Sequence, residues 1–354
     1  MKTLFKHLIP VAACAAVAAS CSADGNAALG FDNPVEVKAD SIAVNEIIQP
    51  NSWTVANGYA VLTSRNTDNV FYVYSLPDFS FKYKYGTKGQ GPGEFPEYIS
   101  LVNDESGDTG GFIISNYGNK THDFYSVDGN TIKLAEQVNI YPLPKRFQSD
   151  IIMPSGMILT EMAGTDNDDF LYTRSGEDGR VLDSVRTYAF TEVKYDDNGN
   201  MYQQSRVNRP LVAVRGSRAA LIYELVDHAD FYEISPEGKF GLIKSSGKDV
   251  LAEDIEKAKN VRSGGRAQGI ASVFATDRYI YALWVDIEID RGERTKITFN
   301  DVQVRIYGWD GERVKSLSLE KPASNIIVSG DDSKLYTYNM EEDFEKVYVY
   351  DTGL

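Results

Sequence analysis

The sequence predicts an all-β chain folded as a six-bladed β-propeller, with four-stranded antiparallel blades and a ring closed by an N-terminal strand. After residue 50, apolar residues alternate with polar ones or form short runs rich in Tyr, Phe, Val and Ile, which is typical of strands. The runs recur as strand, loop, strand, tight turn and strand, with a period near 50 residues that is typical of propeller blades. Asp-Gly or Glu-Gly often stands in the tight turn, where glycine readily takes positive φ.

Six units follow this order, and the sixth ends after its second strand. The expected strands are 59–62, 70–74 and 81–85; 112–114, 123–125 and 132–138; 157–159, 170–172 and 181–185; 220–223, 231–234 and 240–243; 279–283, 302–307 and 314–317; 335–338 and 347–350. The hairpin turns before the last strand of units two to five are Asp128-Gly129, Glu177-Asp178-Gly179, Pro236-Glu237-Gly238 and Asp310-Gly311.

The last unit lacks its outer strand, and the strand-like segment 35–48 has no other assignment. We expect this segment to complete the sixth blade, because an open ring would leave two unpaired edges. Residues 34–354 then form one propeller domain, preceded by a flexible tether at 21–33.

The first twenty residues have the features of a lipoprotein signal peptide. Lys2 and Lys6 precede a mostly apolar stretch at 4–19, which is too short to span a bilayer as a helix. Ala18-Ala19-Ser20-Cys21 is similar to a lipobox, which predicts lipidation of Cys21 and an outer-membrane lipoprotein on the periplasmic or the cell-surface side. Cys14 is a weaker lipidation candidate, and an ordinary secretory signal is the alternative.

Composition excludes several classes of function. The chain has only two cysteines, Cys14 and Cys21, so the mature domain is expected to have no catalytic thiol, disulfide or cysteine metal site. The formal net charge is −15, which disfavours binding to nucleic acid phosphates. No second apolar stretch approaches 18 residues, so the lipid is the only membrane attachment that we expect.

The connector after the first unit carries a family resemblance. Its sequence is Gly86-Thr87-Lys88-Gly89-Gln90-Gly91-Pro92-Gly93-Glu94-Phe95. It resembles the G-x-G-P-G-E-F connector of the TolB-like and NHL-like six-bladed propeller lipoproteins of Bacteroides-type bacteria. This resemblance implies a fold and a cell-envelope location, but no reaction. A phosphate-binding loop is disfavoured, because such a loop must open a helix and prolines follow here.

Metal and catalytic sites have little support in the sequence. His122 and His228 are the only histidines beyond the signal segment, and we expect them at equivalent positions, at the start of the third strand of blades two and four. We interpret both as structural, and expect no catalytic or metal-binding residue. The acidic segments 166–169 and 196–200 leave at most a weakly bound calcium ion as a cofactor, because 196–200 places its glycine wrongly for a calcium loop.

The long loops are expected to share one face of the ring. In up-and-down blades, second-to-third loops and blade-to-blade connections emerge together, opposite the tight turns. The segments 86–96, 188–210, 245–269 and 286–300 define this loop-rich face, and a helix is expected at 249–261. Loops on a rigid scaffold are where binding usually occurs.

Arginines on these loops are the candidate ligand contacts, because guanidinium groups pair well with carboxylates. The candidates, with one aromatic residue, are Arg206, Arg209, Arg262, Arg266, Arg291, Arg294 and Tyr202. Interspersed acids make ordinary solvated charge the alternative interpretation.

We therefore expect a lipid-anchored binding or scaffold protein that presents the loop-rich face to a protein, peptide or glycan. The alternative is a channel-metal hydrolase or lyase of the kind found among lactonase-like propellers.

Overall fold

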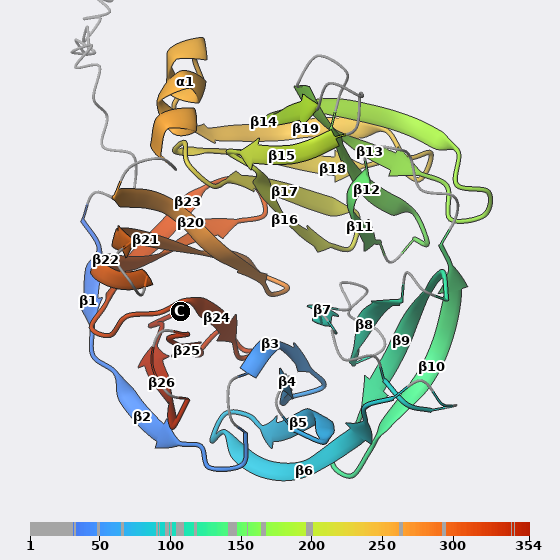
Figure 1. The fold of residues 1–354 in the computed structure, drawn as a ribbon, viewed down its shortest axis with the longest axis vertical. Coiled ribbons are helices and arrows are strands. Elements are labelled where there is room, and N and C mark those ends of the chain that lie inside the picture. The colour runs from blue at the N-terminus through green and yellow to red at the C-terminus, as the bar shows by residue number, and fades with distance from the viewer. Residues whose placement is uncertain are drawn as a thin grey trace, which may run out of the picture.

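The computed structural model describes residues 31–354 except 32, 48–49, 65–66, 90, 92, 96–98, 100, 104–109, 117–118, 141–146, 154, 164–167, 196–200, 262–264, 292–294, 341 and 343. The predicted signal peptide, Cys21 and the tether up to residue 30 lie outside the described residues. The described chain forms six sheets that stand as blades around a ring, as Figure 1 shows. The predicted fold class is confirmed.

Each blade takes its strands in chain order from the centre of the ring outward. Blade one holds β3 (Pro50–Ala56), β4 (Tyr59–Ser64), β5 (Asn69–Ser75) and β6 (Ser80–Thr87); blade two holds β7 (Leu101–Asn103), β8 (Gly111–Asn116), β9 (Thr121–Val127) and β10 (Ile132–Asn139); blade three holds β11 (Phe147–Ile152), β12 (Ile158–Ala163), β13 (Asp168–Arg174), β14 (Val181–Tyr195) and β15 (Met201–Val207). Blade four holds β16 (Pro210–Arg215), β17 (Arg218–Tyr223), β18 (His228–Ile234) and β19 (Phe240–Gly247); blade five holds β20 (Arg266–Ala275), β21 (Tyr279–Arg291), β22 (Thr295–Gly308) and β23 (Arg313–Leu319); blade six holds β24 (Asn325–Val328), β25 (Lys334–Tyr338) and β26 (Lys346–Asp351). The strands expected from the sequence are the second, third and fourth of each blade.

The N-terminal segment closes the ring with two strands, β1 (Val35–Val37) and β2 (Asp40–Ala43). β2 pairs with β26 in antiparallel register, with Asp40 opposite Val349, and so completes blade six as expected. β1 adds to blade five as well, pairing in parallel with β23 and placing Val35 opposite Leu317. Figure 1 shows both strands along the outer edge of the ring. The closing segment therefore covers two blade edges, and not only the one expected.

Phe31 fastens the same segment between blades four and five. Its side chain is 5% exposed and belongs to the apolar cluster that contains Phe231 and Tyr307. The rings of Phe31 and Tyr307 meet edge to face, with centroids 5.0 Å apart. The Arg313 guanidinium lies 4.8 Å from the centre of the Phe31 ring, a cation–π contact. We call residues 31–43 the N-terminal strap.

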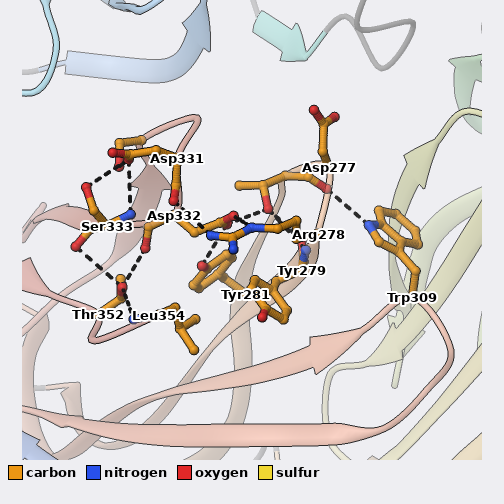
Figure 2. Close-up of polar contacts among 12 residues, drawn as sticks. Asp277, Arg278, Tyr279, Tyr281, Trp309, Asp331, Asp332, Ser333, Thr352 and Leu354 are labelled. Carbon is orange, nitrogen blue, oxygen red and sulfur yellow. Dashed lines mark hydrogen bonds and ion pairs between the residues drawn. The ribbon is translucent and has the colours of Figure 1, made fainter.

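The seam between blades five and six is organised by Asp332 (Figure 2). This residue lies in the turn between β24 and β25 at φ 62° and is 1% exposed. Its Oδ1 accepts hydrogen bonds from the hydroxyls of Tyr281, at 2.8 Å, and Thr276, at 2.5 Å. Its Oδ2 accepts from Nε of Arg278 at 2.8 Å. Burial is the main reason that the pKa of Tyr281 lies well above its usual range, so its hydroxyl remains a donor.

The glycine-rich connector after blade one is structural. Gly86 has φ 76°, and a Cβ there would lie 2.8 Å from the ring of Phe95. Phe95 packs edge to face on Phe71, with centroids 4.9 Å apart. The Glu94 carboxylate accepts a hydrogen bond from the backbone N–H of Gly91 at 2.7 Å. The loop thus satisfies this N–H with its own carboxylate.

Two of the four expected loops are largely strands. The segment 188–210 contains the end of β14 and all of β15, and 286–300 contains the ends of β21 and β22. In the second hairpin, Ile287 pairs with Phe299 and Ile289 with Ile297. Apolar residues therefore alternate with polar ones along both strands, and this period of two residues is what predicts strands. The expected helix is confirmed as α1 (Ala252–Val261).

Candidate functional site

The loop-rich face carries three projections, which are the β14–β15 hairpin, α1 and the β21–β22 hairpin. The first two are parts of blade-to-blade connections, and the third joins the second and third strands of blade five. Strand direction alternates along each blade, so all three emerge on the same face.

In the described part of the chain, no helix is long and apolar enough to cross a membrane.

A pocket of about 180 Å³ opens between blades four and five, and we call it the blade four–five pocket. It lies between the loop that follows β17 and the first residues of β20. Its lining residues are Glu224, Leu225, Ala267, Gln268, Gly269, Ile270, Val285 and Ile287. The walls are therefore mostly aliphatic, with a few polar groups.

The two blades approach closely at this point. The backbone N–H of Ile270 donates to the carbonyl oxygen of Glu224 at 2.7 Å. A Cβ on Gly269 would lie 2.2 Å from the same oxygen, so a glycine is needed there. The side-chain oxygen of Asn208 accepts from the N–H groups of Leu225, at 3.0 Å, and Val226, at 3.2 Å. The loop from blade four is thus held rigidly against β20.

Arg209 stands on one side of the pocket. Its Nε donates to Oε1 of Glu224 at 2.8 Å, Nη2 donates to the same oxygen, and its backbone N–H donates to Oε2 at 3.2 Å. The Arg209 side chain is 45% exposed, whereas that of Glu224 is 10% exposed. The carboxylate is therefore covered, and the guanidinium faces solvent.

Arg266 forms the same kind of pair, but on the opposite face of the β20–β21 sheet from Ala267, Val285 and Ile287. Its Nε donates to Oδ1 of Asp286 at 2.9 Å, and Nη2 donates to Oδ2. Gln268 also donates to Oδ2, at 2.7 Å. The hydrogen bond from Arg266 is the main reason that the pKa of Asp286 falls to about 2. The Arg266 side chain is 63% exposed over a buried carboxylate.

Arg206 is not at the surface, where the sequence interpretation placed it. Its Nε lies 2.7 Å from Asp169 and its Nη2 lies 3.0 Å from Glu161, and its side chain is only 12% exposed. Burying a charged guanidinium is costly unless carboxylates pair with it. Arg206 therefore links β15 to β12 and β13 of the same blade.

The other expected contacts are not placed by the structure. Arg262 and Arg294 lie outside the described residues, as do the side chains of Arg291 and Tyr202. Of the seven expected contacts, the structure places Arg209 beside the pocket through its partner Glu224, and Arg266 on the opposite face of β20. The apolar walls of the pocket had no signal in the sequence, because they come from the loop after β17 in blade four and from two strands of blade five.

The two histidines do not occupy equivalent positions. His122 pairs with Ser115 across blade two, and the matching pair in blade four is Ile222 with Ala229. His228 precedes that position by one residue, so the two imidazoles point to opposite faces of their blades. His122 is buried beside the Ser115 hydroxyl, and burial lowers its pKa to about 4.

His228 holds a polar cluster that lacks the geometry of a hydrolase. Its Nδ1 lies 2.7 Å from the carbonyl oxygen of Lys248, and its Nε2 lies 3.0 Å from Asp230. Burial disfavours the charged ring, but the hydrogen bond to Asp230 and that carboxylate's charge raise the pKa of His228. The Ser245 hydroxyl donates to Asp230 at 2.6 Å, and both imidazole nitrogens bind oxygen acceptors. Neither imidazole nitrogen is therefore placed to accept the Ser245 proton, as a serine–histidine pair would require.

Metal binding has no support among the described residues, where no group of three or more His, Cys, Asp or Glu side chains is placed to hold an ion. The calcium candidate 196–200 and residues 166–167 lie outside the described residues. Asp169 belongs to β13, where its Oδ2 accepts from Arg206, at 2.7 Å, and from Thr191, at 2.9 Å. Asp169 is therefore buried in an ion pair and is not available to a calcium ion.

A family described as TolB-like 6-blade propeller-like matches residues 33–331, which is most of the chain. The chain belongs to this family. The match begins inside the N-terminal strap, just before β1, and ends in the turn between β24 and β25, so it spans the TolB-like propeller except for its last two strands. A search of curated proteins gave no match.

Solved structures of other propellers are distant. Raptor from Chaetomium thermophilum is 11% identical with a TM-score of 0.42, over 89% of this chain and 29% of that one. U3-55K is 6% identical with a TM-score of 0.43, over 90% of this chain and 100% of that one. The WD40 repeats of RRP9 are 6% identical with a TM-score of 0.44, over 89% and 99%. This chain thus spans less than a third of the Raptor chain, and these similarities do not bear on function.

Proposed function

We propose that this TolB-like propeller is a cell-envelope binding protein, anchored through a lipid on Cys21, that binds a protein, peptide or glycan on its loop-rich face. The observation that carries the proposal is the blade four–five pocket. Its aliphatic walls adjoin Glu224, whose buried carboxylate holds the exposed guanidinium of Arg209 in place. Concave, mostly apolar sites with a few fixed polar groups are typical of ligand binding.

Filling the pocket is expected to abolish binding. Ala267 is half-buried in the pocket wall, so in Ala267→Trp the indole would occupy the cavity without burying a charge. We expect the wild-type protein to bind defined members of peptide and oligosaccharide arrays, and Ala267→Trp to lose at least tenfold in affinity for them. The measurement is array binding followed by calorimetry.

Ala271→Trp is the matched control. Ala271 lies on the same strand at its bulge, is exposed and is not part of the pocket lining. This variant should bind like the wild type. If both variants bind every array ligand as the wild type does, the pocket is not the binding site and the proposal fails.

The lipid anchor has a separate test. Cys21→Ala should move the protein from the membrane fraction to the soluble fraction, because the acyl chains supply the binding energy. Fractionation of cells and the mass of the mature N-terminal peptide are the measurements. A wild-type peptide without lipid mass, together with a variant that stays in membranes, contradicts the anchor.

A further inference from the structure

We propose that the free edge of β20 beside the blade four–five pocket binds an extended peptide as an added strand, with one large apolar side chain of the peptide inside the pocket. This inference rests on the proposed function and names the ligand class of the same site. It follows from the register of β20 with β21, from the exposure of the first residues of β20 and from the shape of the pocket.

The innermost edge of blade five carries unpaired backbone groups next to the pocket. β20 is the innermost strand, so only one of its edges pairs with β21. The N–H of Ile289 in β21 donates to the carbonyl oxygen of Gly265, so the backbone groups of Gly265 face β21. Backbone groups of alternate residues in an antiparallel strand point to the same edge. Arg266, Gln268 and Ile270 therefore direct their N–H and C=O groups to the free edge.

A segment of blade four already uses the first position on this edge. The N–H of Ile270 donates to the carbonyl oxygen of Glu224 at 2.7 Å, and Leu225 follows in the wall of the pocket. Gln268 and Arg266 come next along the edge. Both residues are exposed, and their backbone N–H groups have no acceptor among the described residues. Main-chain pairing on such an edge is a recurring way to bind extended peptides.

The pocket lies where a side chain of such a peptide would point. Directly opposite side chains of neighbouring strands lie on the same face of a sheet, so a peptide residue beside Ala267 would point to the face that carries Val285 and Ile287. These three residues line the pocket together with Leu225. The cavity of about 180 Å³ suits one large aliphatic or aromatic side chain. A charged side chain there would lose its hydration with few partners to replace it.

The apolar face continues beyond the pocket along the β21–β22 hairpin. Ile287 pairs with Phe299, and Ile289 pairs with Ile297, with all four side chains half-buried on that face. The next position along the edge lies beside Gly265, which has no side chain to cover Ile289. Alternate residues of a strand are about 7 Å apart. A second apolar side chain, two residues from the first, would therefore meet Ile289, so the expected ligand alternates apolar residues with others.

The test is fluorescence anisotropy of the purified full chain with the labelled hexapeptide acetyl-Ala-Leu-Ala-Leu-Ala-Lys. Two further forms carry N-methyl groups on both leucines or on the three alanines. Alternate residues of an added strand direct their N–H groups toward β20 and away from it. We therefore expect one N-methylated form to lose at least tenfold in affinity and the other to bind within threefold of the parent. Asp in place of both leucines should also lower the affinity at least tenfold.

Gln268→Pro tests the same edge from the protein. Proline has no N–H and its ring blocks pairing, but it is tolerated on a free strand edge, and the bonds from β20 to β21 do not use this N–H. Gln268→Ala is the matched comparison, because both variants lose the side-chain hydrogen bond to Asp286. We expect Gln268→Pro to bind the parent hexapeptide at least tenfold more weakly than Gln268→Ala, with similar thermal unfolding of the two variants.

Equal binding of the two N-methylated hexapeptides would overturn the inference, since insertion of a side chain alone needs no strand pairing. This comparison also decides the matter if Gln268→Pro does not fold. If the parent hexapeptide does not bind but array ligands still depend on the pocket by the Ala267→Trp comparison, this inference fails and the proposed function stands. If no ligand responds to Ala267→Trp, both fail.

Discussion

Replacing Phe31 by Ala is expected to lower the free energy of unfolding by about 3 kcal/mol, as for other buried phenylalanines. Phe31 is buried in the apolar cluster between blades four and five, against Tyr307 and Arg313. Its loss would also loosen the start of the N-terminal strap, because the next attachment along the chain is β1, which pairs over only three residues. Urea unfolding and limited proteolysis should show lower stability and early cleavage before residue 40.

Val35→Ala is the control for this result. Val35 belongs to the same strap but is half-exposed, so the free energy of unfolding should change by less than about 0.5 kcal/mol. Unchanged stability and unchanged proteolysis in Phe31→Ala would show that the strap is not fastened at this point.

Asp332→Ala is expected to lower the free energy of unfolding by about 3 kcal/mol. The substitution leaves the buried hydroxyl of Tyr281 without its acceptor, which costs about 1–3 kcal/mol, and leaves the Thr276 hydroxyl only the longer bond to the carbonyl oxygen of Tyr279. It also removes the carboxylate partner of Arg278 and places alanine at φ 62°. The blade five–six seam should therefore open first, which hydrogen exchange of β24 and β25 would detect.

Two variants separate the causes of this loss. Asp332→Asn tolerates the positive φ and keeps one acceptor oxygen, so it should lose much less stability than Asp332→Ala. Asp331→Ala removes the exposed neighbouring carboxylate, whose partners are the serines at 329 and 333, and should have a smaller effect. If Asp332→Ala is as stable as Asp331→Ala, Asp332 does not hold the seam.

Local sequence patterns were enough to predict the blades. The alternation in segments such as 70–74 and 302–307, and turns such as Asp310-Gly311, report strand period and positive φ over a few residues. The same period in 286–300 was interpreted as a loop, although Ile287, Ile289 and Ile297 alternate with charged residues. The innermost strands had a weaker signal, since β7 and β24 are only three and four residues long.

The candidate site was predicted only in part. Loop position brought Arg209 and Arg266 into the list of contacts; Arg209 lies beside the pocket, whereas Arg266 lies on the opposite face of β20. The same criterion included Arg206, which is buried against Glu161 and Asp169. Whether an arginine side chain is exposed depends on whether carboxylates from other strands pair with its guanidinium. The partners of Arg206 are far from it in the chain, so sequence reasoning does not reveal these pairs.

The sequence by itself determined the strand order, the six-fold repetition and the completion of blade six by the N-terminal segment, because each follows from residues close together in the chain or from an unpaired edge. Only the tertiary structure decided that β1 also joins blade five, that Phe31 lies between blades four and five, and that Leu225 meets Ile270 across a pocket. These contacts join segments from different blades. Their formation depends on shape and hydrogen-bond complementarity between surfaces that exist only after each blade has folded.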